Sequence, residues 1–82
     1  MRTVMLAVLK PGERALVSKI SHGRGAQKRL MDLGLLPGTP IEVIARHPLG
    51  GPILLKVGSS HVALGRRVAE AIEVEKIEGP IS

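Results

Sequence analysis

The stretch RLMDLGLLPGT, residues 29–39, decides the fold of this chain, because it joins a helical pattern to a tight turn that leads into a strand. Ala26, Leu30 and Leu33 are spaced at i, i+4 and i+7, which places them on one side of a helix. The spacing predicts a short amphipathic helix from about Ala26 to Leu33, with these three side chains on its apolar face.

The same stretch contains its own helix stop and turn. Gly34 suits the left-handed backbone position that ends a helix, and Leu35 after it can pack back on the last turn. Pro37 and Gly38 favour a β-turn, because proline presets one backbone angle and glycine permits a positive one. A β-patterned run, Ile41–Arg46, follows directly. The stretch therefore describes architecture, and no catalytic group is found in it.

The rest of the chain reads mostly as short strands separated by turn residues. Five strands are predicted, at Arg14–Ile20, Ile41–Arg46, Ile53–Val57, His61–Leu64 and Ile72–Ile77. Val4–Leu9 reads as an opening strand or extended arm, and Gly65–Ala71 leaves room for one helical turn. The alternation in the last strand puts Ile72 and Val74 inward. This pattern predicts a mainly β fold, a small antiparallel SH3-like barrel with one inserted helix and a short final helical turn.

Composition limits what the chain can do. Its 82 residues fit one domain, residues 1–82, and 44% of them are hydrophobic, as in folded globular domains. Phe, Trp, Tyr and Cys are all absent. There is consequently no aromatic platform for stacking bases, no disulfide and no thiol nucleophile, and the lack of cysteine fits the cytosol. Val4–Leu9 is too short for a signal peptide, and no run approaches the roughly 20 apolar residues that span a bilayer.

The formal net charge of +5 is compatible with nucleic-acid binding. The twelve Lys and Arg residues are spread along the chain, and no run exceeds two. Three interpretations remain open at this point: a solvated basic surface, a nucleic-acid-binding surface, and a surface that faces the cytoplasmic side of a membrane protein or anionic lipid.

The sequence predicts neither an enzyme nor a strong metal site. A barrel of this size fills its interior with side chains, and no nucleophile motif or carboxylate pair accompanies a pocket. His22, His47 and His61 lack the close spacing that presents two ligands together. His47 and His61 flank a hairpin and are the only weak metal candidates. No cofactor is expected.

Two surface features are candidate contacts. Gly23-Arg24-Gly25 precedes the predicted helix, and Arg24, Lys28 and Arg29 add cations to its positive end, which suits an anion. The alternative is a plain glycine connector. Exposed apolar residues are the second feature, and they form a predicted partner-binding patch of Met31, Leu35, Leu36 and Leu49. Ordinary packing under the helix is the alternative for that patch.

Several segments together resemble the ferrous iron transport protein A family, FeoA. They are Leu9–Glu13, Arg29–Thr39, Pro48–Pro52 and Val62–Ile72. The resemblance covers nearly the whole chain, and its central block is the most specific part. It implies a cytoplasmic SH3-like barrel that is accessory to the membrane permease FeoB, which carries a GTP-binding domain. The chain is also similar to the SH3-like C-terminal domain of iron- and manganese-dependent repressors, although it has no DNA-reading helix-turn-helix.

The leading hypothesis is therefore a non-enzymatic module that docks on an iron permease and affects its assembly or GTPase cycle. It meets the membrane only through that partner. Two alternatives are retained: a basic barrel that binds duplex or structured nucleic acid, and a metal-sensing module that uses His47 and His61. Self-association as a homo-oligomer is left open.

Overall fold

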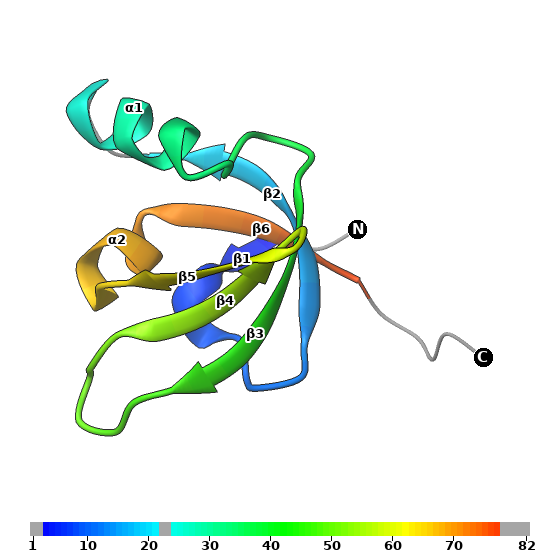
Figure 1. Ribbon diagram of the computed structural model, residues 1–82, viewed down its shortest axis with the longest axis vertical. Helices are drawn as coiled ribbons and strands as arrows, with labels where there is room; N and C mark the ends of the chain where they lie inside the picture. Colours follow the sequence, from blue (N-terminus) through cyan, green and yellow to red (C-terminus); the bar gives the residue numbers. More distant parts are fainter. Residues whose placement is uncertain (1–2, 22–23, 78–82) are drawn as a thin grey trace.

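A computed structural model describes residues 3–21 and 24–77 of the chain. Within these ranges one curved antiparallel sheet is accompanied by short helices (Figure 1). The strands are β1 (Thr3–Met5), β2 (Arg14–Ile20), β3 (Pro40–Arg46), β4 (Ile53–Val57), β5 (Ser60–Leu64) and β6 (Ile72–Ile77). The helices are the 3-10 turn η1 (Leu6–Val8), α1 (Arg24–Asp32) and α2 (Arg66–Glu70).

The six strands follow the order β1-β6-β2-β3-β4-β5. The long β2 lies near the middle and pairs with β6 on one side and β3 on the other. Register shifts between Val17 and Lys19 and between Val43 and Ala45 bend the sheet, because a bulge increases the local twist. The mainly β architecture of a small SH3-like barrel is confirmed, and β1 and β5 are the two edges of its sheet.

The core lies inside the curve of the sheet and is entirely aliphatic among the described residues. Every strand from β2 to β6 contributes inward side chains, and the helices add Leu6, Leu30 and Ala69. Ile72 and Val74 are both buried, as their alternation predicts. No polar or charged side chain in the described ranges is buried. The core of the described residues is therefore held by the packing of aliphatic side chains, with no buried polar side chain in it.

The helix stop forms as predicted. Gly34 has φ +88°, and its N–H donates to the carbonyl of Met31 at 2.9 Å. The N–H of Leu35 donates to the carbonyl of Leu30, also at 2.9 Å, which completes a Schellman motif. The chain thereby turns so that Leu35 enters the core. Leu33, which the spacing places on the apolar face of the helix, follows the last residue of α1 and is 41% exposed.

The turn after the helix docks β3 against β2. The N–H of Thr39 donates to the carbonyl of Leu36 at 3.0 Å across Pro37 and Gly38, and Gly38 has φ +91°. The N–H of Gly38 also donates to the carbonyl of Val17 at 2.6 Å. The turn predicted from Pro37-Gly38 is confirmed, and its backbone groups extend the pairing of the two strands.

The N-terminal run is a three-residue strand, β1, followed by η1, and not one continuous strand or arm.

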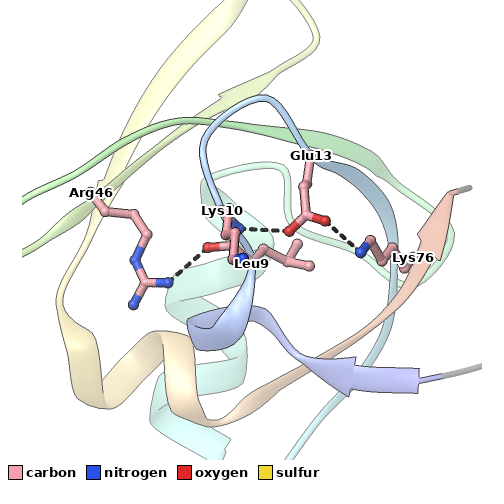
Figure 2. Close-up of polar contacts among 5 residues, drawn as sticks. All are labelled: Leu9, Lys10, Glu13, Arg46 and Lys76. Atoms are coloured by element: carbon pink, nitrogen blue, oxygen red, sulfur yellow. Dashed lines mark hydrogen bonds and ion pairs between the residues drawn. The ribbon is translucent and has the colours of Figure 1, made fainter. Parts of the chain in front are cut away.

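Polar contacts hold the segment from Leu9 to Glu13, which follows η1 (Figure 2). Nη1 of Arg46 donates to the carbonyl of Leu9 at 2.9 Å, and the N–H of Lys10 donates to Oε1 of Glu13 at 2.7 Å. Glu13 also forms an ion pair with Lys76 of β6. The hydrogen bond from Lys76, with a smaller contribution from Lys10, lowers the pKa of Glu13 below its ordinary value of 4.5.

Candidate functional site

The predicted apolar patch is divided by the structure. Met31 of α1 is 53% exposed, and Leu36 in the turn after α1 is 43% exposed. Leu35 between them is fully buried, so its assignment to an exposed patch is wrong. The physical reason is the Schellman motif, which directs Leu35 into the core and leaves Leu36 outside. Met31 and Leu36 remain available at the α1 end of the molecule.

Leu49 does not join these residues. It belongs to the loop between β3 and β4, which lies at the opposite end of the longest axis from α1 (Figure 1). Its side chain is fully exposed and its φ is +60°. Gly50 has φ +73°, and Gly51 donates its N–H to the carbonyl of Pro48 at 3.3 Å, so the loop contains a type I′ turn. Glycine and asparagine are the usual residues there, and leucine is strained.

The side chain of Arg66 in helix α2 lies against this tip. Nη1 of Arg66 lies only 2.6 Å from the position that a Cβ on Gly50 would occupy. Nε of Arg66 pairs with Glu70 one turn later at 3.2 Å. The arginine thus lies across the loop backbone, and the absent side chain of Gly50 makes this contact possible.

The predicted anion site is only partly covered by the described residues. Helix α1 begins at Arg24, but His22 and Gly23 fall outside the described ranges, as do the side chains of Arg24, Gly25 and Ala26. Lys28 and Arg29 are exposed. An anion contact by Arg24, Lys28 and Arg29 stays a prediction.

The two candidate metal ligands are held apart. His47 follows Arg46, which pairs with Ile53 of β4, whereas His61 pairs with Lys56 of the same strand. His47 itself donates its N–H to the carbonyl of Pro52, so four residues separate its position from that of His61, a rise of about 13 Å. No cluster of three His, Cys, Asp or Glu capable of holding a metal ion is found in the described parts of the chain. The idea that the hairpin brings His47 and His61 together is therefore wrong.

A groove that the sequence did not reveal lies between α1 on one side and β5 with α2 on the other. Its volume is about 490 Å³. Apolar residues and one cation line it: Arg29, Leu30, Leu33, Ala63, Leu64, Gly65 and Val68. The sequence places Leu33 on the apolar face of the helix but does not show that this residue lies exposed opposite β5 and α2. A single ionisable lining residue gives the groove no acid–base pair.

None of the helices in the described ranges has the length and apolar character needed to cross a bilayer.

Residues 4–76 match the family described as the FeoA domain. The chain is 38% identical over 73 residues to a putative Fe(2+) transport protein A of Methanocaldococcus jannaschii, covering 89% of this chain and 87% of the relative. It is 34% identical over 73 residues to an Fe(2+) transport protein A/Fe(2+) transporter FeoB fusion protein of Porphyromonas gingivalis. That match covers 88% of this chain and 8% of the fusion protein.

Solved structures share the architecture. A crystal structure described as the iron uptake regulatory protein FeoA superposes with a TM-score of 0.86 at 36% identity, covering 93% of this chain and all of that one. A manganese-dependent transcriptional repressor superposes with a TM-score of 0.83 at 25% identity, covering 92% of this chain and 42% of the repressor. The similarity to a domain of such repressors is thereby confirmed.

Proposed function

This chain belongs to the FeoA domain family, and from that premise we propose that it is a non-enzymatic accessory protein of ferrous iron uptake that docks on the cytoplasmic side of a FeoB-like permease. In this proposal residues 1–82 act as one domain and affect the assembly or the GTPase cycle of the permease. The protein itself is cytoplasmic and approaches the membrane only through its partner.

The observation that carries the proposal is the fusion protein of Porphyromonas gingivalis, in which the two components are one polypeptide. A covalent link holds two modules at a high effective concentration, so it favours partners that act together. The relation supports association with the transporter. The fusion does not indicate which surface of the domain contacts the transporter. The exposed apolar residues of this chain suggest one.

Met31 and Leu36 are the proposed contact. Both are apolar, both are substantially exposed, and both lie at the α1 end of the molecule. Apolar side chains that the fold leaves in water are candidates for burial against a partner. The net charge of +5 complements an acidic permease surface and favours fast association at low salt.

The test is capture of a full-length, detergent-solubilised FeoB-like permease by the immobilised protein. Leu36→Glu is expected to weaken capture at least about tenfold, because it places a carboxylate in a desolvated contact. Val8→Glu is the matched control, since Val8 is also exposed but lies on η1. Equal capture by wild type and Leu36→Glu would remove this surface. No capture by the wild type would remove the proposed function.

A further inference from the structure

Strand β5 is an edge of the sheet that the fold leaves open. It forms its only ladder in the described ranges with β4, through a two-residue loop of Gly58 and Ser59. Native edge strands are usually protected by lysine, proline, a bulge or a very short length. β5 is five residues long, SHVAL, and carries none of these devices. The opposite edge, β1, is only three residues long and leads into η1.

The register identifies the free backbone groups of β5. A two-residue loop is closed by hydrogen bonds between its flanking residues, here Val57 and Ser60. Hydrogen-bonded pairs alternate along an antiparallel ladder, so Val62 and Leu64 also bond to β4. The N–H and C=O groups of His61 and Ala63 consequently point away from β4, toward the open edge.

The groove described above lies against this edge. Ala63, which presents free backbone groups, lines the groove together with Leu64 and Gly65 of the same segment. The opposite wall is α1, where Leu33 is partly exposed to the groove. A strand placed here would have backbone partners on one side and aliphatic side chains on the other. This combination is typical of sites that accept an added strand.

The positive charge beside the groove favours an acidic ligand. Arg29 is the ionisable residue that lines the groove, and Lys28 is its exposed neighbour on α1. Neither takes part in an ion pair within the described residues. A second copy of this chain would bring its own net charge of +5 to the same place, and like charges oppose that pairing. The absence of aromatic residues disfavours a proline-rich helix, which docks on aromatic grooves.

We propose that the open edge of β5 and the adjoining groove bind an extended, acidic segment of another protein, which adds to the sheet as a further strand. Apolar residues of that segment contact Leu33 and Val68, and its carboxylates pair with Arg29. This surface is distinct from the Met31/Leu36 contact, and it does not depend on the identity of the permease partner.

Amide hydrogen exchange by NMR tests the free edge first. In the free protein the amides of His61 and Ala63 are expected to exchange much faster than those of Val62 and Leu64. Slow exchange at His61 and Ala63 in a monomer would overturn the proposal. Protection that disappears on dilution would also overturn it, because it would mean that a second copy covers the edge.

Binding is then measured with a synthetic peptide that alternates glutamate and valine and ends in one tryptophan. This chain contains no Trp, Tyr or Phe, so tryptophan emission reports on the peptide alone. Saturable binding with new protection at His61 and Ala63 supports the proposal. Absence of binding, or equal binding of the same peptide with lysine in place of glutamate, overturns it.

Gly65 offers a matched pair of variants. It lines the groove, precedes α2 as its N-cap residue, and a Cβ there would meet nothing within 4 Å. Gly65→Asp and Gly65→Asn are both good N-caps and differ only in charge. Gly65→Asp is expected to weaken peptide binding about fivefold relative to Gly65→Asn. Equal affinities would contradict the charge argument. Arg29→Glu against Arg29→Gln repeats the comparison on the other wall, without touching the cap.

Discussion

Leu35 and Leu36 differ in what surrounds them more than any other neighbouring pair of identical residues in the chain. Leu35 has no exposed area, whereas Leu36 is 43% exposed. Removing a buried leucine side chain loses its transfer free energy and leaves a cavity. Leu35→Ala is therefore expected to lower the free energy of unfolding by about 2–5 kcal/mol.

Leu36→Ala is the control for that variant and is expected to change stability by less than about 0.5 kcal/mol. Urea denaturation followed by circular dichroism measures both, because the chain has no tryptophan to report unfolding. Equal losses in the two variants would contradict the burial assigned to Leu35.

The backbone conformation of Leu49 is expected to lower the free energy of unfolding. Its φ of +60° is unfavourable for leucine, and its fully exposed side chain returns no burial. Asparagine tolerates this conformation, so Leu49→Asn is expected to raise the free energy of unfolding by about 0.5–1 kcal/mol. A stabilised variant with weaker partner capture would identify Leu49 as a residue kept for binding. A loss of stability would contradict the strain.

Glu13 gives the stability a defined pH dependence. Its pKa is lowered in the folded protein, chiefly by the hydrogen bond from Lys76. The contact therefore stabilises the fold above the unfolded pKa, and this stability is lost as the pH falls through the folded pKa. The free energy of unfolding of the wild type should exceed that of Glu13→Gln at neutral pH and converge with it in acid. A difference that stays constant with pH would contradict this assignment.

At the scale of elements, the end of α1 depends on Gly34. Its φ of +88° is accessible to glycine and poorly accessible to alanine. Gly34→Ala is expected to cost about 1–2 kcal/mol, measured as a lower midpoint in thermal unfolding. Gly34→Asn is the control and should recover much of the loss, because asparagine enters the left-handed region more easily. Similar losses in both variants would contradict this account, because the added Cβ would lie 3.8 Å from Cγ1 of Val57, an ordinary van der Waals contact and not a clash.

The elements themselves could largely be predicted from the sequence. Gly34 and Pro37-Gly38 specify local backbone angles, and period-two alternation specifies the faces of β6, so these features need no long-range information. The exposure of Leu33 could not be predicted, because the periodicity cannot show where a helix ends relative to the core. For the same reason the sequence could not show that Leu35 is buried and Leu36 exposed.

At the scale of the whole molecule, α1 is attached less firmly than the sheet. Among its described side chains only that of Leu30 is buried, and Nε2 of Gln27 donates to the carbonyl of Ile20 at 3.1 Å. The amides of α1 are expected to exchange faster than those of β2 and β6, which pair over most of their length. Protection of α1 equal to that of β2 would contradict this difference.

The candidate sites were harder to predict than the fold, because they depend on which segments meet. The sequence suggests that Leu49 and Met31 belong to one apolar patch. In the fold, the β3–β4 loop and α1 lie at opposite ends of the molecule (Figure 1). It also places His47 and His61 around one hairpin, and the register then separates them. The open edge of β5 is likewise a property of strand order, which local patterns do not encode.

The pairing of β1 with β6 places Thr3 beside Glu75. Paired residues of neighbouring strands lie about 5 Å apart, so the first described residue lies beside β6, two residues before Ile77. A circular permutant that links Thr3 to the end of β6 by a short segment and is opened at Gly58-Ser59 would keep every strand pairing. By the same geometry, the domain can be grafted onto another polypeptide from one corner, while the β5 groove stays clear of the graft.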